Sequence, residues 1–440
     1  MHRSPPRFCS IRSPSRWPGP LLLAAVLALG MLLAGCGDAG VDRSKAQLRV
    51  VNASGYAELD LRVDDGLRQG RIAYGEAAGY LQLDPGTPTL QLTRAGSATP
   101  LLSVAAALAR NRYTTLLAWG REGALQAALL DENAAQPDSG RALLRVFNAA
   151  PEAGALDVYL TAPGDDLATA VPLQAGAAAG VLGNALAVDS RGWRLRVTAA
   201  GSKTDLRLDL PALTLASREV ATLVLTPSRG GALVHALLLS QQAGVARLDG
   251  TAARVRVVAG LADGATVGVT VGGVALMNAV GSPAVGLYAL VPAGTQAVAL
   301  AVDGTPLAAA DVVLAAGGDF TLLVRGRPAT AAASWLEDDN RPALDAAQAR
   351  VRLVHGVADL AAPLALTVDF VPAADGVLPG DGSGYASFAA TTTARLAVTA
   401  SGQPAPLFTA IDQRLDGGGV YSVFVVGPLA APTGILRRDR

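Results

Sequence analysis

Apolar and polar residues alternate along several short stretches of the chain, which is the pattern of half-buried β-strands. The alternation is clear at 59–64 (LDLRVD) and returns at 80–83 (YLQL). Turn sequences follow both stretches, with Asp-Asp-Gly at 64–66 and Asp-Pro-Gly at 84–86. Helical spacing is scarce, and only the Ala-rich run 101–110 is ambiguous. The pattern therefore predicts many short strands joined by tight turns.

One of these strand-like stretches recurs along the chain. Leu48-Arg49-Val50-Val51-Asn52-Ala53-Ser54 is closely matched from Leu144, and weaker copies begin at Val255 and Val351, so the starts lie 96, 111 and 96 residues apart. A closing strand that begins at residue 112 in the first copy begins at residue 319 in the third, 64 residues after the start in both. Self-similarity at a nearly fixed period indicates a tandem array.

Units of about 100 residues with several turn-separated strands are typical of β-sandwiches that bury their own cores. We therefore predict an all-β protein with four tandem immunoglobulin-like β-sandwich domains, separate from one another like beads and without a shared solenoid. In Leu48 to Ser54, Leu48 and Val50 are expected on one face, and Arg49 and Val51 on the other. The predicted boundaries are 1–35 for a leader, 36–46 for a tether, and 47–136, 141–243, 252–338 and 348–440 for the sandwiches.

The first repeat resembles a bacterial family known as domain-of-unknown-function family 4397. The residues that carry the resemblance are 48–54 (LRVVNAS), 74–80 (YGEAAGY) and 85–87 (PGT). The match is good in the first repeat, fair in the third and fourth, and weak in the second beyond its first strand. The resemblance implies secreted or envelope-anchored, immunoglobulin-like domains, and it supplies no active-site residue.

The N-terminus predicts a targeting segment. Four arginines without any acid precede a 13-residue apolar run at 21–33, which is shorter than the roughly 20 residues that span a bilayer as a helix. Leu33-Ala34-Gly35-Cys36 follows and resembles the bacterial lipobox, which implies cleavage before Cys36 and its modification with diacylglycerol and acyl chains such as palmitate. Gly37 in place of Asp favours the outer membrane. The alternative is an ordinary signal peptide with an incidental cysteine.

Composition excludes some classes of partner. The chain has 440 residues, 51% hydrophobic and 16% charged, with a formal net charge of zero. Without the four leader arginines, 32 basic residues face 36 acidic ones, which argues against nucleic acid as a partner. The two cysteines are Cys9 in the leader and Cys36, so no disulfide is expected.

Catalytic chemistry has few candidates in the sequence. His235 and His355 lie in apolar, strand-like runs and are interpreted as ordinary strand residues. Neither has a zinc-type neighbour, and the chain lacks a nucleophile elbow, a phosphate loop and a dinucleotide fingerprint. We therefore predict no enzymatic activity and no cofactor.

Acidic clusters close two of the repeats. Asp131-Glu132-Asn133 follows the first repeat, and Glu337, Asp338 and Asp339 hold the same place after the third. The second repeat has Ser240-Gln241-Gln242 at this place. Oxygen ligands between tandem sandwiches suggest a weak calcium candidate at Glu337, Asp338 and Asp339. The alternative is a set of solvated linker acids that keep a strand edge from pairing.

Together these patterns suggest a non-enzymatic, lipid-anchored protein of the cell envelope that displays sandwich domains for binding, adhesion or spacing. Its expected partners are the membrane, through the lipid on Cys36, and a protein or glycan ligand of unknown identity. Two alternatives remain open. One is an envelope hydrolase with a site assembled between domains, and the other is a purely structural spacer.

Overall fold

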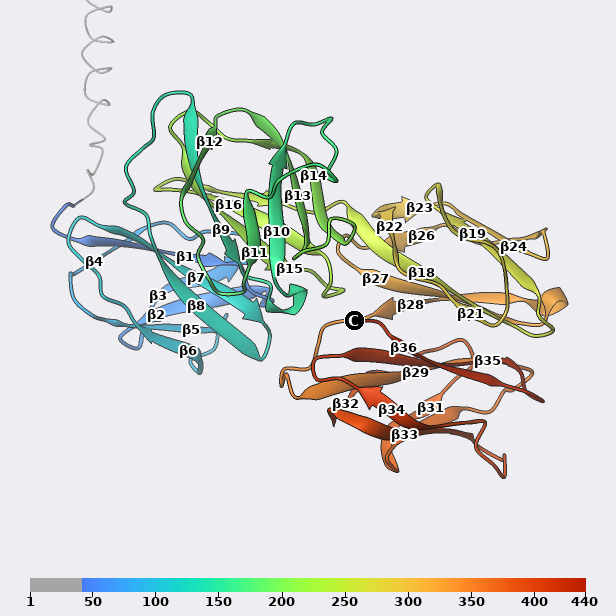
Figure 1. The fold of residues 1–440 in the computed structure, drawn as a ribbon. Helices are drawn as coiled ribbons and strands as arrows, with labels where there is room; N and C mark the ends of the chain where they lie inside the picture. Colours follow the sequence, from blue (N-terminus) through green and yellow to red (C-terminus); the bar gives the residue numbers. More distant parts are fainter. Residues whose placement is uncertain (1–41) are drawn as a thin grey trace, which may run out of the picture. The chain divides into compact units, whose positions relative to one another are not determined.

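The computed structural model describes residues 42–440, which form strands and two short 3-10 helices but no α-helix (Figure 1). The predicted all-β class with tandem sandwiches is confirmed. Residues Ser44–Arg440 form one compact unit. The predicted leader, Cys36 and most of the tether lie outside the described residues. Within 42–440, no helix is long and apolar enough to cross a membrane.

The first sandwich has two four-stranded sheets, ordered β4-β1-β7-β8 and β3-β2-β5-β6. The ambiguous Ala-rich run supplies strand β6 and no helix. The strands are β1 (Ala46–Asn52), β2 (Glu58–Val63), β3 (Gly66–Ala73), β4 (Leu81–Leu83), β5 (Thr89–Arg94), β6 (Pro100–Ala105), β7 (Tyr113–Arg121) and β8 (Ala124–Asp131).

The second sandwich has a five-stranded sheet, β12-β9-β15-β16-β17, and a four-stranded sheet, β11-β10-β13-β14. A 3-10 helix, η1 (Pro151–Ala153), follows its first strand. The strands are β9 (Arg141–Asn148), β10 (Leu156–Thr161), β11 (Gln174–Ala177), β12 (Leu186–Asp189), β13 (Gly192–Ala199), β14 (Leu206–Thr214), β15 (Val220–Pro227), β16 (Val234–Ser240) and β17 (Val245–Leu248).

The third sandwich pairs the sheet β21-β18-β27-β28, with β22 also on β18, with the sheet β20-β19-β24-β25 and a two-stranded β23-β26 ribbon. A second 3-10 helix, η2 (Pro328–Thr330), precedes its last strand. The strands are β18 (Ala252–Leu261), β19 (Thr266–Val271), β20 (Val274–Gly281), β21 (Ala284–Val285), β22 (Ala289–Pro292), β23 (Gly294–Gln296), β24 (Val298–Val302), β25 (Thr305–Leu307), β26 (Val312–Leu314), β27 (Asp319–Gly326) and β28 (Ala332–Asp338).

The fourth sandwich repeats the plan of the first, with sheets β32-β29-β35-β36 and β31-β30-β33-β34. The strands are β29 (Gln348–Ala358), β30 (Leu364–Val368), β31 (Val371–Val377), β32 (Ala386–Ala389), β33 (Thr391–Ala400), β34 (Phe408–Leu415), β35 (Val420–Pro428) and β36 (Thr433–Arg438).

In every sandwich the strand that opens the repeat is the parallel neighbour of the closing strand. In the first copy β1 runs parallel to β7, with Gln47 opposite Tyr113, and β8 returns antiparallel to β7. The pairs β9–β15, β18–β27 and β29–β35 have the same geometry. We call the sheet that holds the opening strand the inner sheet and the opposite sheet of each sandwich the outer sheet.

Each sandwich has a hydrophobic core between its inner and outer sheets. In the first, Leu48 and Val50 of β1 face Leu59 and Leu61 of β2 across this core, and all four side chains are fully buried. Because successive residues of a strand point to opposite faces, Arg49 and Val51 face the other way, as the sequence predicts.

The expectation of bead-like separation is wrong, because neighbouring sandwiches pack through their inner sheets. Val51, Leu117 and Phe147 belong to one cluster that joins the first sandwich to the second. Val258, Leu323, Val354, Phe424 and Val426 form the corresponding cluster between the third and fourth. A sheet with apolar residues on both faces needs a cover on both, and the adjacent repeat supplies it.

Trp119 belongs to this junction and not to the core of its own sandwich. It is half-buried on β7, and its ring meets Phe147 of the second sandwich edge-on, with the centroids 5.7 Å apart. By contrast, Trp193 and Trp335 pack against the cores of their own sandwiches. The face of β7 that turns away from its own core is thus covered by the second sandwich.

Candidate functional site

The second residue of the repeat motif is a buried arginine in three of the four copies. Arg49, Arg256 and Arg352 are 1%, 1% and 2% exposed. Each lies on the face of its opening strand that turns away from its own core, so its guanidinium enters the junction with the neighbouring sandwich. A buried charge is strongly destabilising unless it is paired and hydrogen-bonded, so the partners of these arginines decide what the junction can do.

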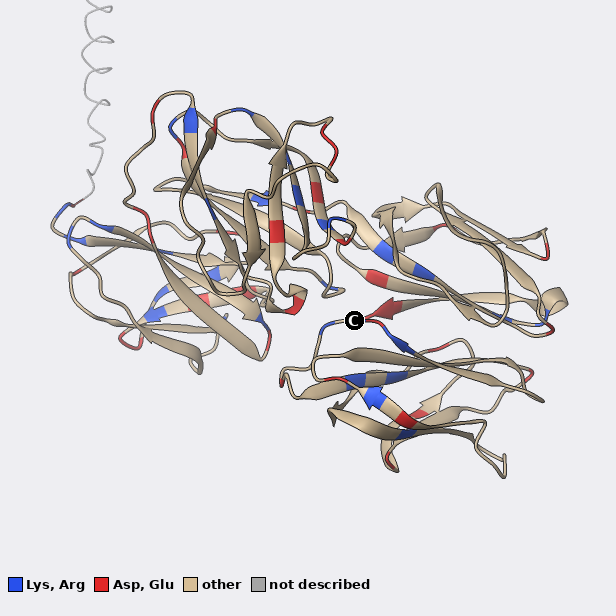
Figure 2. Ribbon diagram, in the orientation of Figure 1, with Lys and Arg blue, Asp and Glu red and all other residues tan. Residues whose placement is uncertain are grey.

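Figure 2 shows that charged residues elsewhere occur as isolated bands on strands and at turns. Among the buried charged residues of the described chain, Arg49, Glu132, Arg256, Asp338 and Arg352 all belong to the junctions.

The third and fourth sandwiches exchange arginine–carboxylate pairs. Arg256 of β18 binds Asp439, beyond the end of β36, with 3.2 Å between Nη2 and Oδ2. Arg352 of β29 binds Asp338 at the end of β28. Each arginine therefore makes its hydrogen-bonded ion pair with an acid of the other sandwich, and Arg256 also lies 3.8 Å from Asp338 of its own sandwich. The two crossed pairs relate the sandwiches as two equivalent halves.

Hydroxyl groups on the closing strands complete these pairs. Arg256 Nε donates to Thr321 Oγ1 at 2.8 Å, and Arg352 Nε donates to Ser422 Oγ at 2.8 Å. Thr321 then donates to Asp338, and Ser422 donates to Asp439. The acceptors of both carboxylates are thus occupied by donors from two sandwiches, which is the condition for a buried ion pair to persist.

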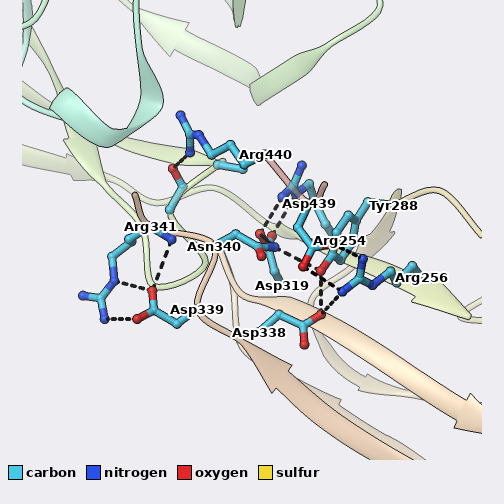
Figure 3. Close-up of polar contacts among 12 residues, drawn as sticks. Arg254, Arg256, Tyr288, Asp319, Asp338, Asp339, Asn340, Arg341, Asp439 and Arg440 are labelled. Carbon is cyan, nitrogen blue, oxygen red and sulfur yellow. Dashed lines mark hydrogen bonds and ion pairs between the residues drawn. The ribbon is translucent and has the colours of Figure 1, made fainter. Parts of the chain in front are cut away.

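Tyr288 extends this network within the third sandwich (Figure 3). Its hydroxyl donates to Asp338 Oδ2 at 2.6 Å, and its ring lies 4.6 Å from the guanidinium carbons of both Arg254 and Arg256. Burial raises the pKa of Tyr288 well above its usual value, so the phenol stays protonated and remains a donor.

Asp319 is a second buried acid next to this group. Arg254 donates two hydrogen bonds to its carboxylate, at 2.8 and 2.5 Å, and Asn340 donates a third at 2.8 Å. Burial raises the pKa of Asp319, although these donors oppose the shift. A bidentate arginine fixes the orientation of the carboxylate as well as its charge.

The junction between the first and second sandwiches uses the same side chains with one change. Arg49 Nε donates to Thr115 Oγ1 at 2.8 Å, and its Nη2 binds Glu132, which also accepts from Tyr80. Glu132 belongs to the same sandwich as Arg49. The second sandwich contributes backbone carbonyls instead, those of Ser240 and Ala243.

The second repeat lacks the acid because Gln241 takes its place. Gln241 exchanges two hydrogen bonds with the backbone of Ala134 in the first sandwich, at 3.0 and 2.8 Å. Arg145, the equivalent of Arg49 in this repeat, donates to the carbonyl of Asp131 at 3.2 Å, and its buried Nε has no partner within the described chain. The junction between the first and second sandwiches therefore contains fewer ion pairs than the junction between the third and fourth.

The three acids of the calcium candidate face different arginines. Asp338 is buried and forms an ion pair with Arg352, whereas Glu337 is half-exposed and its Oε1 lies 3.4 Å from Nη2 of Arg229. Among residues 42–440 no group of three or more His, Cys, Asp or Glu could hold a metal ion.

Asp339 faces a pair of arginines of its own. It accepts from Arg341 at 2.6 Å and from Arg350 at 3.0 Å. Burial raises the pKa of Asp339, but the hydrogen bonds from the two arginines outweigh it and lower the value to about 2. This carboxylate is therefore ionised at neutral pH, and both arginines are bound to it.

His355 is a structural side chain at the end of its opening strand. Its Nδ1 accepts from the Val357 amide at 3.2 Å, and Nε2 donates to the Ala362 carbonyl at 3.2 Å. Asn52 makes the same kind of contacts in the first sandwich, to the Ser54 amide and to two carbonyls. The interpretation of His355 as a strand residue thus gains a specific role, which is to tie the end of the strand to the following loop.

His235 lies on β16 and lines a cavity between the second and third sandwiches. Its Nδ1 accepts from the Gly250 amide at 2.9 Å, and burial lowers its pKa. Ser228 lies nearby with a buried hydroxyl, but within the described residues it shares no hydrogen bond with His235. A serine nucleophile activated by histidine needs that contact.

Sequence reasoning missed the buried arginines because arginine in an alternating strand looks solvent-exposed. A signal was nevertheless present. An arginine second in the repeat and an acid at or just after the returning strand recur together in three repeats, as Arg49 with Glu132, Arg256 with Asp338, and Arg352 with Asp439.

Comparisons with known proteins address the family and leave the activity open. A family profile described as "Domain of unknown function (DUF4397)" matches residues 46–159 and 253–364, which is about half of the chain. None of the curated proteins matches the chain. A solved structure from Bacteroides uniformis, described as a candidate cell adhesion protein, matches with 14% identity and a TM-score of 0.20, covering 46% of this chain and 99% of that one.

Proposed function

Because the chain belongs to the family described as Domain of unknown function (DUF4397), whose description names no activity, we propose a function from the chain's own residues. We propose a non-enzymatic, lipid-anchored protein of the cell envelope that displays paired β-sandwiches for binding or adhesion.

The observation that carries the proposal is the use of the buried ionisable groups. Arg256, Arg352, Asp338 and Asp439 bind one another across a junction, and Tyr288 donates into the same network. Groups held in this way fix two sandwiches against each other. The arrangement is that of a scaffold, and it presents loops and outer sheets to a partner.

The anchor is proposed from the leader. The 13-residue apolar run at 21–33 and the lipobox-like Leu33-Ala34-Gly35-Cys36 support cleavage before Cys36 and attachment of acyl chains to it. Two or three acyl chains hold a protein firmly on a membrane, whereas one does so only weakly. Gly37 supports an outer-membrane location.

Metabolic labelling tests the anchor, with a matched control in the chain itself. Cells that express the protein are fed radioactive palmitate, and the wild type is compared with Cys36→Ala and Cys9→Ala. We expect label in the wild type and in Cys9→Ala, and an unlabelled precursor in Cys36→Ala. Normal maturation and labelling of Cys36→Ala would overturn the lipid anchor.

Crosslinking on intact cells tests the binding role. Protease shaving first establishes which side of the membrane carries the sandwiches, and crosslinked partners are then recovered with the anchored protein. A protein or glycan recovered with the wild type supports a binder. Recovery of the protein alone at several crosslinker lengths would favour a spacer.

A further inference from the structure

A cavity of about 420 Å³ lies where the second and third sandwiches meet. This size is within the range of pockets that hold small molecules. Its apolar wall comes from β14 and β22 and the residues around β16, and includes Leu206, Leu208, Leu233, Leu290, Val291 and Pro292. The cavity is separate from the junctions within the two pairs of sandwiches and takes no part in the function proposed above.

His235 provides one hydrogen-bond donor on this wall. Because the Gly250 amide donates to Nδ1, the proton of the neutral ring resides on Nε2. Nε2 lies against Gly317, another lining residue, so closely that a Cβ at Gly317 would come within 2.8 Å of it. No other group of the described chain accepts from Nε2. The donor is therefore available to a molecule inside the cavity.

The charges around the cavity balance one another. Arg194 holds Asp209 with two hydrogen bonds of 2.8 and 2.5 Å, and Arg207 binds Asp205 at 2.6 Å. Burial also lowers the pKa of His235, which keeps its ring neutral at physiological pH. An occupant consequently has no unpaired charge to neutralise, and an ion would lose its hydration without gaining a partner.

We infer that this cavity binds a small, uncharged and mainly apolar molecule that carries one carbonyl-type acceptor, received by His235 Nε2. The apolar wall removes the body of the ligand from water, and the single donor orients it. Gly317 is required at its position because a side chain there would collide with both His235 and Ser228.

Calorimetric titration of the full chain in lipid nanodiscs tests this inference, with acetophenone as the probe. Ethylbenzene has a similar size but no acceptor, and benzoate adds a negative charge. Empty nanodiscs give the blank for partitioning into lipid. We expect acetophenone to bind roughly three- to ten-fold more tightly than ethylbenzene, which is the worth of one hydrogen bond, and benzoate to bind more weakly than either.

Two variants separate the wall from the donor. Leu290→Trp fills the cavity and should abolish binding of both neutral probes, whereas Leu67→Trp, at an exposed position of β3, should leave it unchanged. His235→Asn keeps an acceptor for the Gly250 amide but loses the Nε2 donor, so it should bind acetophenone and ethylbenzene equally.

The inference is overturned by absence of binding, by equal binding of the two neutral probes to the wild type, or by tighter binding of benzoate. It is also overturned if the acetophenone preference survives in His235→Asn, or if folded Leu290→Trp binds like the wild type. Circular dichroism establishes that each variant is folded.

Discussion

Arg256 and Asp439 lie 183 positions apart in sequence and form a buried ion pair between the third and fourth sandwiches. Arg352 and Asp338 form the reciprocal pair in the opposite direction. Two crossed pairs of this kind require both sandwiches to be present in one orientation. The junction therefore specifies which surfaces meet, in addition to contributing buried apolar contacts.

Asp439→Asn is expected to destabilise the protein strongly. The change keeps the volume of the side chain but leaves the buried charge of Arg256 without its main counterion, and loss of one partner of a buried pair costs about 3–5 kcal/mol. Urea denaturation measures the difference. Asp189→Asn is the control, because Asp189 pairs with Arg141 on the surface and such pairs contribute about 1 kcal/mol or less. Similar losses in both variants would contradict the role of the junction.

Arg352→Met and Arg145→Met occupy equivalent positions and are expected to behave differently. Arg352 is buried on Asp338, so its removal leaves that acid short of a donor and should cost about 3–5 kcal/mol. Arg145 has no acidic partner within the described chain and carries a buried, unpartnered Nε, so methionine should be within about 1 kcal/mol of neutral, or stabilising. Thermal and urea unfolding of the two variants provide the comparison. Equal costs would show that an arginine is needed there whatever its partner.

The third and fourth sandwiches are expected to recombine when produced as separate chains, residues 252–344 and 345–440. Each fragment alone exposes residues that are fully buried in the structure, among them Val258 and Leu323 on one and Phe424 on the other. We expect a one-to-one complex in analytical ultracentrifugation. Asp439→Arg should prevent it, whereas Asp375→Arg, on the exposed side of β31, should not. Two stable, monomeric fragments that ignore each other would restore the picture of independent beads.

The stability of the protein is expected to fall below about pH 6.5, and His355 should account for part of the loss. Burial lowers the pKa of His355 in the folded state, so the unfolded chain binds a proton more readily. The stabilisation is present above the unfolded value of 6.5 and is lost as pH falls through the lowered folded value. His235 contributes with the same sign.

His355→Asn isolates this contribution, because Asn fills the corresponding position as Asn52 and Asn148. At pH 7.5 we expect a loss of no more than about 2 kcal/mol, as for an ordinary buried substitution. Between pH 7.5 and 5.0 the melting temperature should fall less than in the wild type. An unchanged pH dependence would show that His355 is not protonated in this range.

The strands and the repeats could be predicted because their signals are local. Alternation around Leu59 and turn residues such as Asp64 and Asp65, which both adopt positive φ, depend on neighbours in sequence. The apolar residues on the second face, Val51 and its equivalents, are typical of sheets covered on both sides, a signal that the prediction of separate sandwiches did not use. Pattern alone could not say which surface provides the cover.

The buried polar network was missed for a different reason, because the recurrence of an arginine and an acid does not say which residues bind each other. An arginine on a strand has the same appearance whether its partner is water or a carboxylate from another repeat. The position of Asp338 after the third sandwich suggested an oxygen ligand for calcium, and the structure gives it arginine, tyrosine and threonine donors instead. Of these donors, only Arg352 is brought to Asp338 by the pairing of sandwiches.

The parallel pairing of opening and closing strands has a consequence for how tandem copies are arranged. Gln47 lies opposite Tyr113, and Thr114 lies opposite Asp131, so the chain enters and leaves the first sandwich at the same end of its strands. The fourth shares this layout. A short connection from this end of the strands places the next copy beside the previous one and not beyond its far end. Duplication of the unit therefore adds exposed surface while adding little length along the strand direction.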